Sequence, residues 1–163
     1  MAEALERLER DCRTRPLGED VLRDYHRGLL PADGGAYRTG AVTMTGSTVV
    51  PPPPATVASL MRRLAAALAE RQKAWDASAP ALDDLLREGM DVYQRLGFIH
   101  PFRDGNGRVA RLALNHLFRR YGRPYVILPP LSESPELMDA LQDGHRGTLD
   151  GLVRLGRARL CPV

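Results

Sequence analysis

The sequence predicts an all-α domain that carries one small β-hairpin. Apolar residues recur at helical spacing through most of the chain. A single stretch, residues 42–50, instead combines β-branched residues with a central Gly46-Ser47 pair, which is typical of a hairpin. With 163 residues, 44% of them hydrophobic and 26% charged, the chain is long enough to form its own core. We therefore expect one domain over residues 1–163, with its core between roughly 15 and 155.

The helices are expected in a fixed order along the chain. Two helices come first, at about residues 1–12 and 19–30, and a turn-rich loop, the hairpin and four prolines follow. Pro54 begins a helix with an inward apolar stripe, and the polar stretch 73–80 is expected to connect it to the next helix, 81–97. The remaining expected elements are a helix that ends near Gly122, an extended segment over 123–130, and two helices through 137–141 and 149–155.

The most informative segment runs from His100 to Leu112 and reads HPFRDGNGRVARL. Its two glycines permit unusual dihedral angles and close approach of the backbone to a ligand. A helical apolar pattern follows them, so the glycine turn is expected at a helix N-terminus, where free N–H groups and the helix dipole attract anions. Arg108 and Arg111 lie three residues apart, and guanidinium groups suit phosphate oxygens. The segment therefore indicates a phosphate site.

Two further side chains of this segment suit chemistry at a phosphate. Asp104 is its only carboxylate, and a lone carboxylate beside phosphates is typical of a Mg²⁺ site, which is completed by phosphate oxygens and water. His100 has an ordinary pKa of about 6.5, so it can accept a proton from a hydroxyl at neutral pH. His26 and His116, in contrast, lie within helical patterns and are expected to be structural.

The segment resembles the signature of the Fic family, H-P-F-x-[D/E]-G-N-G-R-x-x-R, at every specified position. Residues 35–38, Gly-Ala-Tyr-Arg, resemble the family's G-x-[F/Y]-R element, and residues 42–54 resemble its β-hairpin flap and the prolines after it. The resemblance implies a Fic-type helical bundle and an enzyme that transfers AMP from ATP, with Mg²⁺, to a Ser, Thr or Tyr hydroxyl of a protein target.

The resemblance also implies a role for each matching residue. His100 would be the general base, Asp104 would hold Mg²⁺, and Phe102 would anchor the loop in the core. The nucleotide phosphates would be bound by Gly105, Asn106, Gly107, Arg108 and Arg111. A target peptide would pair with the edge of the flap, at Met44, Thr45 and Gly46.

Two departures from the family pattern leave alternatives open. Where relatives carry a Tyr pair and an Asn that contact the nucleoside, this chain has Ser134–Met138 and Asp143–His145, with no aromatic residue after Tyr125. A different nucleotide, another diphosphate donor or a small-molecule acceptor is therefore an alternative, and His145 is a candidate for contact with the base. A Doc-type kinase is disfavoured because Gly107 is intact, and a non-catalytic nucleotide- or peptide-binding module because the reactive side chains are present.

The second departure concerns regulation. The chain has no [S/T]-x-x-x-E-[G/N] sequence, whose Glu pairs with the second motif arginine in relatives. Either the domain is active alone, or an inhibitory, antitoxin-like partner supplies a Glu to Arg111.

Composition excludes several other classes of function. The net charge is +3, and the arginines alternate with acids instead of forming a basic stripe with aromatic residues, so we expect no nucleic-acid partner. No run approaches about 18 apolar residues, so we expect no membrane span. The four histidines and two cysteines show no zinc-ligand spacing. The charged N-terminus is unlike a signal peptide, so we expect a cytoplasmic protein, with secretion by a signal-less route left open.

Overall fold

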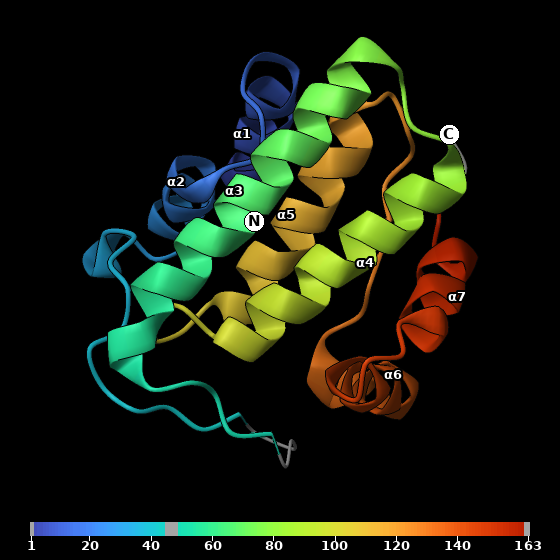
Figure 1. Cartoon of the computed structure of the whole chain (residues 1–163). Helices are drawn as coiled ribbons and strands as arrows, with labels where there is room; N and C mark the ends of the chain where they lie inside the picture. The colour runs from blue at the N-terminus through green and yellow to red at the C-terminus, as the bar shows by residue number, and fades with distance from the viewer. Residues whose placement is uncertain (1, 45–48, 162–163) are drawn as a thin grey trace.

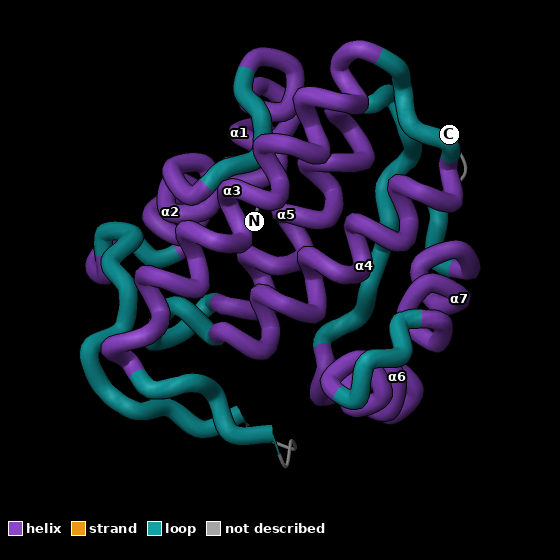
Figure 2. Tube along the Cα trace, viewed as in Figure 1, coloured by secondary structure: helices purple, strands orange, loops and turns teal. Residues whose placement is uncertain are grey.

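The computed structural model describes residues 2–44 and 49–161, and this part of the chain consists of helices and loops (Figure 2). The expectation of an all-helical fold is therefore confirmed. The α-helices are α1 (Ala2–Thr14), α2 (Glu19–Leu29), α3 (Pro54–Ala77), α4 (Leu82–Ile99), α5 (Asn106–Arg120), α6 (Pro135–His145) and α7 (Asp150–Ala158), with single 3₁₀ turns at Pro31–Asp33 and Leu131–Glu133. Among these helices, none is long and apolar enough to cross a membrane.

Helix α5 lies in the middle of the bundle. It packs against α4, α1 and α2, while α3 covers α2 and α4, and α6 and α7 lie against α4 (Figure 1). The first residues of α5 and the last residues of α4 meet at one end of this pair, where a short loop joins them. The signature segment is this loop and the first turns of α5, so the most extensive packing in the bundle directly supports it.

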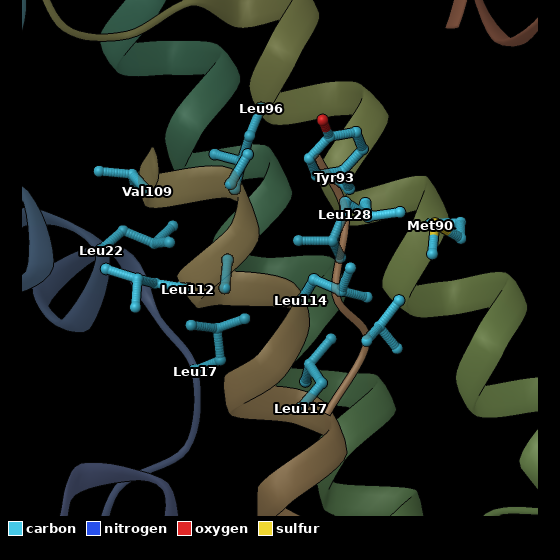
Figure 3. Close-up of a cluster of buried hydrophobic side chains, with 14 of the residues drawn as sticks. Leu17, Leu22, Met90, Tyr93, Leu96, Val109, Leu112, Leu114, Leu117 and Leu128 are labelled. Carbon is cyan, nitrogen blue, oxygen red and sulfur yellow. The ribbon is translucent and has the colours of Figure 1, made fainter. Parts of the chain in front are cut away.

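The core between α4 and α5 explains why these helices approach closely. Figure 3 shows Leu114 and Leu117 of α5 and Tyr93 and Leu96 of α4 in one cluster of buried side chains, all of them nearly inaccessible to solvent. Gly89 makes the approach feasible, because a Cβ there would lie only 2.7 Å from Cδ1 of Leu114. Burial of such side chains contributes about 1.5–3 kcal/mol each, and the same residues supply the helical apolar spacing in the sequence.

The predicted end of the third helix is wrong by about one turn. Residues 73–77, expected in a polar connection, continue α3. Two contacts explain the extension. Gln72 is buried and bonds both backbone groups of Leu17, at 2.8 and 2.9 Å, and Trp75 packs edge-on against Tyr121 with ring centroids 5.5 Å apart. Contacts with other parts of the chain therefore stabilise the helical conformation of this polar segment, which its local sequence alone does not predict.

The predicted hairpin flap is not seen. Its described flanks, residues 42–44 and 49–50, are loop without a strand, whereas Thr45 and Gly46 lie outside the described residues. Val50 is 81% exposed, and none of the described residues of this stretch is buried in the core. A two-stranded hairpin without such support is marginally stable at best, which gives a physical reason for the difference.

Candidate functional site

The signature loop connects α4 to α5 through two residues with left-handed backbone. His100 ends α4 with φ 48°, and Gly105 caps the start of α5 with φ 79°. Gly105 adopts this conformation without strain, but a histidine is rarely found there and is destabilised by about 1 kcal/mol or more. The structure around His100 must therefore hold it in place.

Arg38 provides that restraint from a distant part of the chain. Its buried guanidinium donates hydrogen bonds to the carbonyls of His100 at 2.7 Å, Pro52 at 2.6 Å and Gly40 at 3.1 Å. Its backbone N–H donates to the carbonyl of Pro101 at 2.9 Å. Arg38 therefore ties the signature loop to both ends of the segment that carries the predicted flap, which gives the Gly-Ala-Tyr-Arg element a structural role.

His100 is arranged to act as a base. Its Nδ1 lies 3.2 Å from the carbonyl oxygen of Gly97, which can only accept, so Nδ1 carries the hydrogen. The lone pair of a neutral imidazole is then on Nε2. Burial lowers the pKa of His100, and the bond to Gly97 opposes that shift without reversing it. The side chain is therefore neutral at pH 7, with Nε2 ready to take a proton.

The middle of the loop is held by Phe102 and Asn106. Phe102 is fully buried, as expected of an anchor. The Asn106 side chain accepts a hydrogen bond from the N–H of Phe102 at 2.9 Å and donates one to its carbonyl at 2.8 Å. Asn106 was expected to contact phosphate, but the structure gives its amide group to the loop backbone. Only its own N–H, at the start of α5, remains for an anion.

The tip of α5 presents backbone N–H groups that suit an anion. The first N–H groups of the helix, at Asn106, Gly107 and Arg108, have no partner within the helix. A Cβ at Gly107 would meet nothing within 4 Å, so a ligand can approach this backbone closely. Arg108 donates to Asp104 at 3.2 Å in a largely exposed pair, which is worth less than about 1 kcal/mol and is easily rearranged.

Asp104 is suited to a metal that brings most of its own ligands. Its carboxylate is 72% exposed, and one oxygen accepts the Gly105 N–H at 2.5 Å. The described residues contain no cluster of three or more His, Cys, Asp or Glu side chains that could hold a metal alone. A single accessible carboxylate beside an anion site fits Mg²⁺, which in proteins commonly takes one or two carboxylates together with substrate phosphates and water.

Two hollows flank this loop. A cavity of about 720 Å³ is lined by residues 36–43 together with Asp33 and Arg103 of the loop, and the segment that reaches Met44 forms its wall. A groove of about 280 Å³ is lined at one edge by Arg108 and Arg111. The apolar part of the groove is formed by Leu5, Leu8, Leu29, Leu112, Val126, Ile127 and Leu128. The guanidinium of Arg111 has no hydrogen-bond or ion-pair partner among the described residues.

The structure shows where the three remaining histidines lie, and only the loop contact of His26 could not be found from the sequence alone. His26 of α2 stacks on Phe102 and bonds the backbone of Asp104, although nothing in its sequence neighbourhood links it to the loop. His145 of α6 accepts a hydrogen bond from Gln94 at 2.8 Å and lies 5.5 Å from the ring of Phe98. Phe98 is partly exposed two residues before His100. His116 is buried between the Tyr25 hydroxyl, at 2.7 Å, and the Arg15 carbonyl, at 3.0 Å, as a structural histidine.

Known proteins resemble this chain in both sequence and structure. The protein adenylyltransferase Fic of Culex quinquefasciatus is 33% identical over 138 residues, which span 82% of this chain and 25% of that protein. A Fic domain containing signaling protein from Bacteroides thetaiotaomicron has a solved structure that covers 95% of this chain and 63% of its own, with a TM-score of 0.73 and 25% identity. The BepC protein of Bartonella tribocorum, solved with bound AMPPNP, shares the fold with a TM-score of 0.73 at 16% identity, over 99% of this chain and 84% of its own.

These similarities extend over most of the chain, although the chain spans only about a quarter of the length of the mosquito relative. A sequence model described as the Fic/DOC family matches residues 16–118, which run from the end of α1 to within α5 and include the whole signature segment. That match covers more than half of the 163 residues, and the chain belongs to the Fic/DOC family.

Proposed function

We propose that the chain is the catalytic domain of a protein adenylyltransferase, which transfers AMP from ATP to a Ser, Thr or Tyr hydroxyl of a protein target. The observation that carries the proposal is the placement of a neutral His100, with Nε2 unprotonated, at one end of a loop whose other end is the anion-binding tip of α5. The name of the relatives, protein adenylyltransferase, supports the choice of the group transferred.

The reaction follows from the positions of these groups. Nε2 of His100 accepts the proton of the acceptor hydroxyl, and the oxygen forms a bond to the α-phosphorus of ATP. The bond from that phosphorus to the bridging oxygen of the β-phosphate breaks, and pyrophosphate leaves with the electron pair. Arg108 and Arg111, on the first turns of α5, neutralise the charge that grows on the leaving group.

The phosphates would lie against the N-terminus of α5. Gly107 leaves this backbone open, whereas Gly105 fits closely against Leu30 and His26, so the N–H groups from Gly107 onward can donate to phosphate oxygens. Asp104 would hold Mg²⁺ beside them, and the ion, when bound, supplies positive charge that stabilises the phosphate oxygens. The Arg108–Asp104 pair would then exchange for bonds to the nucleotide and metal.

The protein target would approach from the side of the larger cavity. Val42 and Thr43 line it, and residues 42–44 have no strand partner among the described residues, so the backbone near Met44 can pair with an extended target segment. Pairing of this kind fixes a target by its main chain and leaves the acceptor side chain directed at the loop. Thr45 and Gly46, which lie outside the described residues, belong to the same proposal as target contacts.

An inhibitory partner would act at Arg111. Its guanidinium has no bonded partner within the described chain, and the groove beside it is apolar, with Leu5 42% exposed and Ile127 57% exposed. A partner helix with an apolar face and one Glu would fill the groove and pair with Arg111. That pair would occupy the guanidinium that a triphosphate needs, so inhibition would be relieved when the helix leaves.

The alternative nucleotide donors differ in the nucleobase that the protein must bind. Phe98 lies in the last turn of α4, and His145 lies in the segment that aligns with the nucleoside contacts of the family. Their rings are 5.5 Å apart and could contact a nucleobase, and the Gln94 amide orients His145. This pair replaces the aromatic residues that the sequence lacks after Tyr125. A pyrimidine nucleotide or another diphosphate donor remains the second candidate, because a single exposed phenylalanine and a histidine do not by themselves select adenine.

One labelling experiment tests these proposals together. The protein is incubated with cell lysate, Mg²⁺ and each nucleoside triphosphate, labelled at either the α- or the γ-phosphate, and products are read by intact mass. We expect α-label from ATP on protein, and a loss of about 10²–10⁴-fold in the His100→Ala variant. Glu70→Ala, on an exposed face of α3, is the control and should keep the wild-type rate. Transfer of γ-label would indicate a kinase, and nucleotide binding without any covalent product would indicate a binding module.

A further inference from the structure

His26 is the buried side chain that joins α2 to the signature loop. Its ring is fully buried and lies parallel to that of Phe102, with centroids 3.9 Å apart and an interplanar angle of 10°. Its Nε2 lies 3.1 Å from the backbone oxygen of Asp104. That oxygen can only accept, so Nε2 carries the hydrogen and donates it.

The other ring nitrogen indicates why a histidine occupies this position. Nδ1 of His26 is buried and has no hydrogen-bond partner among the described residues. An unsatisfied buried acceptor is destabilising, whereas a phenylalanine would stack on Phe102 without one. Stability therefore does not explain the histidine. What it provides and a phenylalanine cannot is the hydrogen bond to Asp104.

The carboxylate of Asp104 has few other restraints. Its side chain is largely exposed and is held by the neighbouring Gly105 N–H and the solvent-accessible Arg108. Its position therefore depends on the backbone from which it projects. The loop fits closely against α2 here, because a Cβ at Gly105 would lie 3.0 Å from Cδ1 of Leu30 and 3.6 Å from Cδ2 of His26.

We propose that His26 is a positioning residue for the metal-binding carboxylate. By holding the Asp104 carbonyl, it fixes the backbone at the start of α5 and directs the carboxylate toward the phosphates at the helix tip. The proposal rests on the function proposed above only in that Asp104 holds the metal. Side chains that orient a metal ligand, without touching the metal, typically change metal affinity or activity about 10–100-fold when they are replaced.

The test separates the hydrogen bond from the ring stack. His26→Phe keeps the stack and removes the donor, whereas His26→Gln keeps an N–H donor and removes the ring. Tyr25→Phe is the matched control, because it deletes a hydrogen bond from the same helix, to His116, away from the loop. For each variant, binding of Mn²⁺ in the presence of a non-hydrolysable ATP analogue is measured by electron paramagnetic resonance, together with the melting temperature and the Mg²⁺ concentration for half-maximal transfer.

We expect His26→Phe to raise the Mn²⁺ dissociation constant about 10–100-fold while its melting temperature stays within about 4 °C of the wild type. Saturating Mg²⁺ should then restore most of its transfer rate. His26→Gln should bind Mn²⁺ more tightly than His26→Phe, and Tyr25→Phe should bind it as the wild type does. If His26→Phe does not fold, His26→Met replaces it as the variant without a donor.

Three results would overturn the proposal: unchanged Mn²⁺ affinity in the variant without a donor, equal weakening in His26→Gln, or unchanged affinity in Asp104→Ala. The binding measurement requires no turnover. A wild-type protein that binds Mn²⁺ and nucleotide but attaches nothing to a target would therefore contradict the proposed function and leave the role of His26 intact.

Discussion

The Asn106→Ala substitution removes the two hydrogen bonds that hold the backbone of Phe102 in the signature loop. Each such bond contributes about 1 kcal/mol, and a buried N–H left without a partner adds about 1–3 kcal/mol. Asn106 is 4% exposed, so water does not readily replace its amide. We therefore expect a loss of roughly 3–5 kcal/mol in the free energy of unfolding, which lowers the melting temperature by about 6–20 °C in a chain of this size.

The same substitution should impair catalysis beyond its effect on folding. The two hydrogen bonds between Asn106 and Phe102, here called the clamp, lie between His100 and the tip of α5. Their loss lets the base and the phosphate site move relative to each other. A misplacement of about 1 Å can lower the rate about 10²-fold. The assay is AMP transfer at a temperature well below the measured melting point, expressed per folded molecule.

The chain contains a matched control for this clamp. Asn115 holds Val126 in the same way, accepting from its N–H at 2.8 Å and donating to its carbonyl at 3.0 Å. Asn115→Ala should lose a comparable amount of stability and keep most of its transfer rate per folded molecule. If both variants lose activity to the same extent, or if Asn106→Ala transfers AMP at the wild-type rate, the clamp does not position the site.

Three further predictions concern titration and backbone space. Because burial lowers the pKa of His100, kcat/KM should stay level as the pH falls to about 6.5 and decline only below it. A decline of kcat/KM that begins above pH 6.5 would contradict the role of His100 as the base. Burial lowers the pKa of His116 to about 4, so between about pH 6.5 and 4 the unfolded chain binds a proton that the folded chain does not. Denaturant unfolding should therefore show the free energy of unfolding falling by about 3 kcal/mol as the pH is lowered from about 6.5 to 4. His116→Gln should make this pH dependence weaker. Gly105→Ala should lower the melting temperature, since φ is 79° and the methyl group would lie 3.0 Å from Leu30. Gly107→Ala should fold normally, because its methyl group would meet no protein atom, but should bind ATP more weakly, because the methyl group would project toward the proposed phosphate site.

The helices could be predicted because each one buries a continuous apolar stripe. The spacing of Leu85, Met90, Tyr93 and Leu96 predicts α4, and these residues form its buried face. Helix ends were harder to predict, because they depend on partners elsewhere in the sequence. Gln72 keeps α3 helical by bonding Leu17, a contact over 55 positions that no local pattern contains. The hairpin prediction used β-propensity, a Gly-Ser turn signal and a family resemblance. Of these, propensity describes a strand that has a surface to pack against.

The reactive residues of the site were also easier to predict than the residues that hold them in position. His100, Asp104 and the two arginines are close in sequence, so their residue types and spacing already suggested phosphate chemistry. The residues that hold them come from other helices and loops: Arg38 reaches the His100 carbonyl across 62 positions, and His26 reaches the Asp104 carbonyl across 78. An unremarkable arginine or histidine in a sequence gives no sign of such a contact, and only the fold brings the two parts together.

The division between these two groups of residues has a physical reason. A base, a metal ligand and a phosphate site must remain accessible to substrates, so Asp104 and Gly107 are exposed and cannot be fixed by packing of their own. Besides the buried Phe102 ring, the loop is restrained by hydrogen bonds that end on backbone groups. They join Arg38 to the His100 carbonyl, Asn106 to the backbone of Phe102, and His26 to the Asp104 carbonyl. Because separate parts of the chain supply these restraints, loss of one should shift one reactive group more than the others. His26 variants should therefore weaken metal binding before they affect proton transfer, and Arg38 variants should do the reverse.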